Sequence, residues 1–75
     1  MDKKILEIAC SVLKMSEQDV LKNHKRLDDI NAYYFWCPQR GGLSMIVNDK
    51  GEKLAASSAI SFNRLFTDFN NGRRN

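Results

Sequence analysis

The chain has 75 residues, which is enough for one small domain over residues 1–75 and leaves little room for a deep catalytic cavity. Its hydrophobic fraction of 43% argues against disorder, and its net charge of +3 is lower than most dedicated nucleic-acid-binding domains of this size carry. The longest wholly apolar run, Tyr33 to Cys37, is too short to span a membrane.

Cysteine usage and the N-terminus both indicate a cytoplasmic protein. Cys10 and Cys37 are too few to build the disulfide framework of a small secreted domain. The N-terminal residues do not show the pattern of a signal peptide. We therefore expect a cytoplasmic chain with reduced thiols and no membrane association.

The first third of the chain has the pattern of two helices. Apolar residues recur at helical spacing from Asp2 to Met15, which predicts a first helix. Ser16 is a typical N-cap, followed by acidic residues that suit the positive end of the helix dipole. We predict a second helix that ends near Arg26, and then a polar connector from Asp28 to Asn31.

Three strands follow, and strand composition and turn residues define them. Four successive aromatic residues predict a strand from Ala32 to Cys37, which Pro38 ends. Alternating apolar residues predict a second strand from Leu43 to Asn48. A hairpin turn closed by Gly51 connects it to a third strand, Glu52 to Ser58.

Strand periodicity divides the side chains of this sheet between two faces. The expected inner face carries Tyr33, Phe35, Cys37, Leu43, Met45, Val47, Leu54 and Ala56. The expected outer face carries Tyr34, Trp36 and Ile46, with Arg40 in the adjoining loop. Exposed Trp and Tyr are typical of protein interfaces, so we predict these four as binding residues. Alternatively, the N-terminal helices cover this face and its residues belong to the core.

The chain ends in a helix with a clear apolar stripe. Ser61 caps it, Gly72 is well placed to end it, and the stripe between them provides much of the expected core. The stripe consists of Phe62, Leu65, Phe66 and Phe69. The predicted fold is α+β in the order ααβββα, a three-stranded antiparallel meander with helices packed against it on one face.

Few residues suggest catalysis, metal binding or phosphate binding. Cys37 with His24 as its base would form a nucleophilic pair, but the spacing supplies neither an orienting group nor an oxyanion hole. One His and two Cys are too few and too far apart for a metal site. The pair Gly41-Gly42 precedes a strand, whereas a phosphate-binding loop opens a helix. We therefore predict no enzyme, no catalytic residues, no metal and no cofactor.

A basic run from Lys22 to Arg26 raises nucleic-acid binding as an alternative. The two opening helices would then act as a helix-turn-helix. Glu17 and Asp19 argue against this, because they stand where the reading helix would approach phosphates. A solvated helix face is the favoured interpretation. An aromatic sheet face used with basic residues remains the second functional hypothesis.

Three motifs carry a family resemblance: the aromatic strand, the hairpin run Ile46 to Glu52, and Ser58-Ala59-Ile60 before the last helix. From about Tyr33 to Phe69 the chain resembles small immunity-protein domains of bacterial polymorphic toxin systems, of the kind shared with small heat-stable bacterial proteins. The resemblance implies a non-catalytic inhibitor that binds a protein partner, such as a toxin domain, by steric occlusion. A homodimer through the sheet face is a further expectation.

Overall fold

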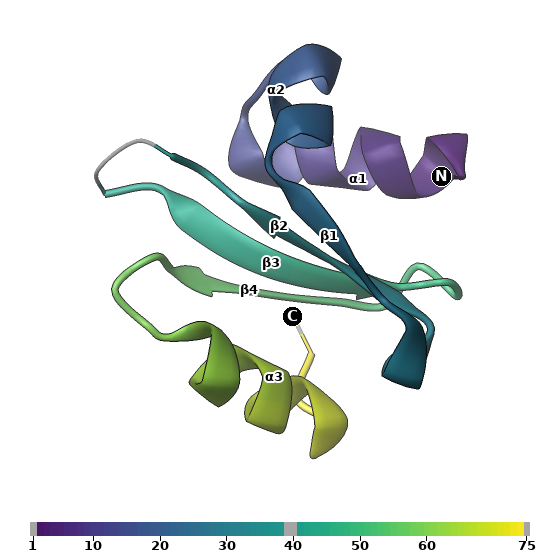
Figure 1. Ribbon diagram of the computed structural model, residues 1–75, viewed down its shortest axis with the longest axis vertical. Helices are drawn as coiled ribbons and strands as arrows, with labels where there is room; N and C mark the ends of the chain where they lie inside the picture. Colours follow the sequence, from purple (N-terminus) through teal and green to yellow (C-terminus); the bar gives the residue numbers. More distant parts are fainter. Residues whose placement is uncertain (1, 39–40, 75) are drawn as a thin grey trace.

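The computed structural model describes residues 2–38 and 41–74 and has α+β architecture (Figure 1). Its elements are α1 (Lys3–Leu13), α2 (Glu17–Lys22), β1 (His24–Leu27), the 3-10 helix η1 (Asp28–Ile30), β2 (Ala32–Trp36), β3 (Leu43–Asn48), β4 (Lys53–Ser57) and α3 (Phe62–Asn70). The strands form one antiparallel sheet in the order β1-β2-β3-β4. The predicted fold class is confirmed, but the sheet has four strands within the described residues and not three.

The first helix forms where its apolar spacing predicts it. The Asp2 side chain accepts a hydrogen bond from the Lys4 N–H (3.0 Å) and so caps the helix. Ile5, Ala9 and Leu13 are buried on the face that packs on the sheet. The helix ends at Leu13, and its C-cap residue Lys14 has a left-handed φ of 55°.

The predicted second helix is wrong in its second half. Ser16 caps α2 as expected, since its Oγ accepts from the Asp19 N–H (3.2 Å). The helix stops at Lys22, and the following residues extend as β1 and pair with β2. Pairing with the aromatic strand gives the backbone groups of this segment that face β2 their hydrogen-bond partners.

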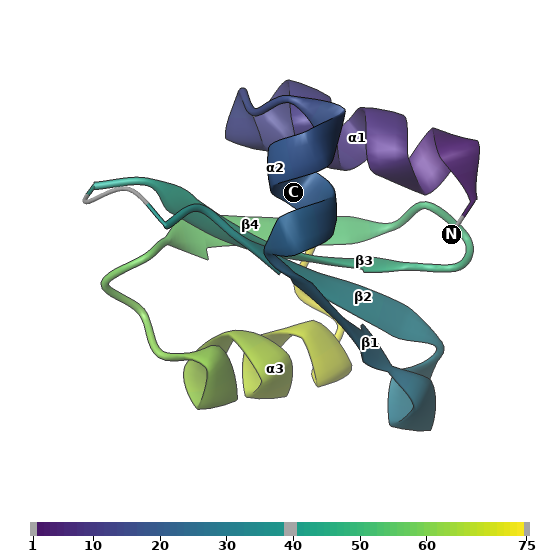
Figure 2. The same ribbon diagram turned by 45° about the horizontal axis from the view of Figure 1, so that its top comes forward.

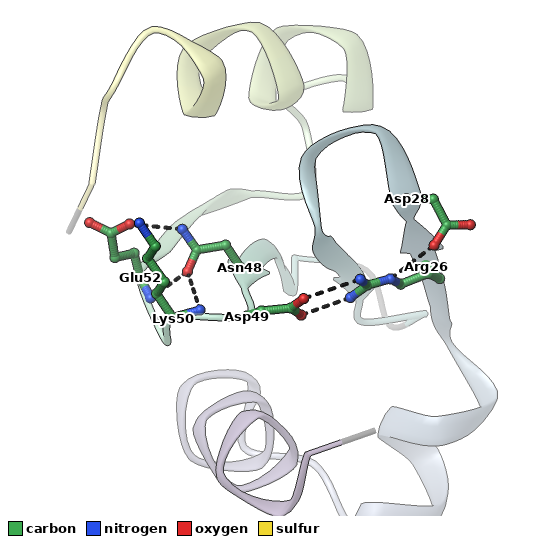
Figure 3. Close-up of polar contacts among 6 residues, drawn as sticks. All are labelled: Arg26, Asp28, Asn48, Asp49, Lys50 and Glu52. Carbon is green, nitrogen blue, oxygen red and sulfur yellow. Dashed lines mark hydrogen bonds and ion pairs between the residues drawn. The ribbon is translucent and has the colours of Figure 1, made fainter.

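The turn between β3 and β4 sets the register of the last strand. The Gly51 N–H donates to the Asn48 carbonyl (2.9 Å), and Gly51 has a φ of +88°. The Asn48 Oδ1 accepts from the backbone N–H groups of Lys50 (3.0 Å) and Glu52 (2.9 Å) (Figure 3). Asn48 therefore stands opposite Glu52, across a turn of three residues.

This register places the side chains of β4 on the opposite faces of the sheet from those predicted. A two-residue turn would place Leu54 beside Met45, as we expected from the sequence. The three-residue turn instead pairs Leu54 with Ile46 and Ala56 with Ser44. A shift of one residue moves each side chain to the other face, so Leu54 and Ala56 lie on the face of Tyr34 and Ile46.

Helices cover both faces of the sheet, contrary to the predicted single layer (Figure 2). The first core lies under α1 and α2 and contains Ile5, Ala9, Leu13, Val20, Phe35, Met45 and Val47. The second core lies under α3 and contains Leu27, Ala32, Ile46, Leu65 and Phe69. The predicted outer face is thus covered in part, and the helix that covers it is α3 rather than the N-terminal pair.

The last helix agrees with its predicted stripe. The Ser61 Oγ accepts from the Arg64 N–H (3.2 Å), and Gly72 follows the helix with a φ of +92°. Leu65 and Phe69 are buried against the sheet, whereas Phe62 and Phe66 are half-buried. No helix of the described residues is long and apolar enough to cross a membrane.

Candidate functional site

A groove lies on the α3 side of the sheet, beside the first turn of that helix and over parts of β1 and β2. The helix packs mainly on β3 and β4. The adjoining surface is hollowed by a cavity of about 330 Å³. We call this the aromatic groove. It is lined by Lys25 of β1, Tyr34 and Trp36 of β2, and Phe62 of α3.

The walls of the aromatic groove are rings in direct contact. Tyr34 and Trp36, two residues apart on one strand, stack with their centroids 5.3 Å apart and their planes 28° apart. Phe62 contacts Tyr34 edge-on with a centroid distance of 4.6 Å, and the ring centroids of Phe62 and Phe66 lie 5.5 Å apart. Because these contacts fix the rings against one another, the apolar surface is preformed.

Lys25 supplies a positive charge at the groove. It stands directly opposite Tyr34 in the β1–β2 register, so its side chain shares the groove face. The side chain is exposed, and the described residues show no ion pair to it. The groove therefore combines an apolar floor with one unneutralised cation.

The neighbouring Arg26 faces the other side of the sheet and is neutralised. Its guanidinium donates to both carboxylate oxygens of Asp49 (2.8 and 3.2 Å) and to Asp28 (3.1 Å) (Figure 3). It also lies 4.7 Å from the centroid of the Tyr33 ring. The hydrogen bond from Arg26 holds the pKa of Asp49 below its ordinary value. This contact ties β1 to the β3–β4 turn and so fixes the strand that carries Lys25.

The structure brings together two of the four predicted binding residues. Tyr34 and Trp36 form the groove, as their shared strand phase indicated. The prediction for Ile46 is wrong: it is fully buried beneath α3, because the last helix covers the middle of the sheet. Arg40 lies outside the described residues.

Sequence reasoning missed Lys25 and Phe62. The sequence pattern predicts a helix at Lys25, and a helix hides the strand phase that Lys25 shares with Tyr34. The same pattern places Phe62 on the buried stripe of the last helix. Its position in the first helical turn was the available signal, because the end of a helix often overhangs the sheet that its middle covers.

The residues considered for chemistry have other roles. His24 Nδ1 donates to the Leu21 carbonyl (2.7 Å), and its ring stacks on Phe35 at 6.0 Å. Both cysteines are free, and burial raises the pKa of the Cys10 thiol, which lowers its reactivity. Within residues 2–38 and 41–74, no three His, Cys, Asp or Glu side chains gather into a group able to hold a metal ion.

Comparison of the chain with models of protein families, with curated proteins and with solved structures found no match. A function must therefore be inferred from the chemistry of the aromatic groove.

Proposed function

We propose that this protein is a non-catalytic protein-binding module whose partner occupies the aromatic groove. The observation that carries the proposal is the stacked Tyr34–Trp36 pair, which stays half-exposed beside the helix that buries Ile46 of the same face. Trp and Tyr are enriched at interface hot spots because they bury a large area at a low cost in side-chain entropy. A preformed aromatic surface further reduces the ordering cost of binding.

The groove is small and carries one charged group. Its volume of about 330 Å³ is near the lower end of the roughly 300–1,000 Å³ typical of ligand pockets. Its single charged group, Lys25, provides no acid–base pair. These features support the insertion of one aromatic or long aliphatic side chain from a protein surface.

Within this class, the resemblance to immunity-protein domains supports an inhibitor. Such a protein would block a toxin domain by occupying its surface, with no chemistry of its own. Rigid binding suits that role, because both faces of the sheet are packed by helices and the groove is lined by residues of three elements.

Nucleic-acid binding is the second candidate, and Lys25 beside the stacked rings is the observation that favours it. Tyr34 and Trp36 would serve as stacking platforms for bases, and Lys25 would contact phosphate. The charge of the other strand cation near this site, Arg26, is already neutralised by Asp49 and Asp28. One unneutralised cation at the groove is a weak electrostatic footprint, which makes this function the less favoured one.

The test is a pull-down from the native cell, followed by titration of the captured partner at low and high salt. Trp36→Ala should weaken protein binding by about 2 kcal/mol or more, roughly 30-fold. Leu21→Ala is the matched control, because Leu21 is an exposed apolar residue on α2, outside the groove. Binding to a protein should tolerate salt, whereas phosphate contacts weaken steeply with it.

Two results would change the proposal. Capture of nucleic acid alone, with binding lost at moderate salt, would establish the second candidate. Capture of a protein whose affinity is unchanged by both Trp36→Ala and Tyr34→Ala would keep the class of function and move the site out of the groove, with the exposed Lys22 of α2 as the next residue to test.

A further inference from the structure

The edge of the sheet beside the aromatic groove has outward-facing backbone groups. The Trp36 N–H donates to the Asn23 carbonyl (3.1 Å), which sets the phase of the β1–β2 ladder. In an antiparallel pair, hydrogen-bonded residues alternate with residues whose N–H and C=O face away. Lys25 therefore turns its backbone toward β2, while His24 and Arg26 turn theirs to the outer edge.

In the described part of the chain, no further strand pairs with that edge. β1 is the terminal strand of the sheet, and the backbone N–H groups of His24 and Arg26 have no partner among the turn, loop and cap hydrogen bonds. A row of this kind is a template for an added strand. Side chains on one side of an added strand would lie next to Lys25 and above the aromatic groove.

The charge of β1 indicates what the added strand carries. Lys25 and the nearby Lys22 are exposed and, among the described residues, have no ion pair. An acidic residue beside Lys25 would neutralise the cation at the groove. A second copy of the chain is a poor occupant, because pairing β1 with another β1 places Lys25 and its basic neighbours against the same residues.

We propose that the partner docks by adding an extended strand to β1, with an acidic residue beside Lys25 and an aromatic or long apolar residue in the aromatic groove. The inference rests on the proposed function and specifies the partner segment. Backbone hydrogen bonds from His24 and Arg26 would supply affinity, and the alternating side chains would supply specificity.

The experiment selects binders from a phage-displayed library of random peptides and then studies an enriched peptide by NMR. We expect enriched sequences in which an acidic residue and an aromatic or long apolar residue stand two positions apart, because only every second residue of a strand faces the same side. In the saturated complex, amide exchange at His24 and Arg26 should slow roughly tenfold, the scale of one backbone hydrogen bond. The Lys25 and Leu27 amides, which already face β2, are the internal control and should change little.

Charge reversal tests the acidic preference. Lys25→Glu should weaken the selected peptide roughly fivefold or more at low salt, since it replaces an attraction by a repulsion. Lys3→Glu is the matched control, because it changes the net charge equally at an exposed position in the first turn of α1. Both positions are exposed, so both variants should keep the fold.

The outcomes separate this inference from the proposed function. Peptide binding that requires Trp36 but leaves exchange at His24 and Arg26 unchanged would overturn strand addition and keep the groove. Slowed exchange that ignores Trp36→Ala would keep strand addition and overturn the groove. Enriched sequences without an acidic residue would overturn the inferred partner. If exchange at His24 and Arg26 slows when the concentration of this protein is raised without peptide, the occupant of the edge is a second copy. That result would overturn the inferred partner as well.

Discussion

The two faces of the sheet are closed to different degrees, and adjacent residues on β2 show it. Phe35 points toward α1 and α2 and is fully buried, whereas Trp36 points toward the α3 side and is half-buried. On the first face, Met45 and Val47 are also fully buried. On the second face burial is complete at Ile46 but incomplete at Tyr34. The first face is fully buried along its centre, with Tyr33 and Ala55 half-buried beside it, whereas the second face ends in the aromatic groove.

Simple dimensions explain the difference. Neighbouring strands lie about 4.8 Å apart, so the outer strands of a four-stranded sheet are separated by roughly 14 Å. A helix with its side chains is about 10 Å across, so one helix covers about two strands and two helices cover the full width. The first face has α1 and α2, whereas the second has only α3 over β3 and β4. The uncovered width is where the aromatic groove lies.

The largest expected effect is that of Phe35→Ala. It removes a fully buried ring from the closed face, so it should destabilise the fold by about 3–5 kcal/mol. Denaturant unfolding monitored by circular dichroism measures the change. Trp36→Ala is the matched variant one residue further along the strand and should lose clearly less stability, despite the larger ring. Equal losses would mean that the two faces are closed to the same degree.

The next largest effect is expected within α3. Phe69 is only 3% exposed, so Phe69→Ala should also cost about 3 kcal/mol or more. Phe66→Ala removes the same atoms from a half-buried position, and a clearly smaller loss should follow. The midpoint of denaturant unfolding separates the two variants. If Phe66→Ala proves the more destabilising variant, α3 is rotated so that Phe66 and not Phe69 faces the sheet.

A smaller effect is expected at Ile46, which the strand pattern alone placed on the binding surface. Because Ile46 is fully buried under α3, Ile46→Val should lower the free energy of unfolding by about 0.5–1.5 kcal/mol. It should leave partner affinity unchanged, since the groove keeps its lining. The two readouts are denaturant unfolding and partner titration. A loss of affinity without loss of stability would restore Ile46 to the interface.

Local patterns predicted most of the elements, but the missing strand depends on distant contacts. The segment from His24 to Leu27 is short, with three polar ring or cationic side chains before one leucine, and a helix is equally consistent with it. Their strand conformation is stabilised by pairing with β2 and by the contact from Arg26 to Asp49. Neither partner is visible in a short sequence window.

The site was predictable only in part, for a related reason. The shared strand phase of Tyr34 and Trp36 is a local property of one strand, and the structure places both side chains on one face as predicted. The burial of Ile46 depends on where α3 docks, and the facing of Leu54 depends on a turn of three residues rather than two. One residue in a turn reverses a whole strand, so register is the least predictable feature of such a sheet.

The smallest expected effect concerns pH and the contact that holds β1 to the rest of the sheet. The hydrogen bond from Arg26 keeps the pKa of Asp49 below its ordinary value of 3.8 in the folded protein. The unfolded chain therefore binds this proton first as the pH falls, and protonation favours unfolding. The stabilisation from Asp49 is complete above pH 3.8 and is lost as the pH falls through the lower pKa of the folded state.

Asp49→Asn should therefore lower the thermal midpoint slightly at neutral pH and make it less sensitive to acid. The loss should be small, because the pair is partly exposed and screened by solvent, and it should shrink further at high salt. Asp29→Asn in η1 is the matched control, because it removes one exposed carboxylate that has no ion pair among the described residues. Thermal unfolding followed from neutral pH to well below 3.8 gives the comparison. If Asp49→Asn keeps the acid sensitivity of the unmodified protein, the ion pair does not stabilise β1. The position of Lys25 must then depend on the β1–β2 pairing alone.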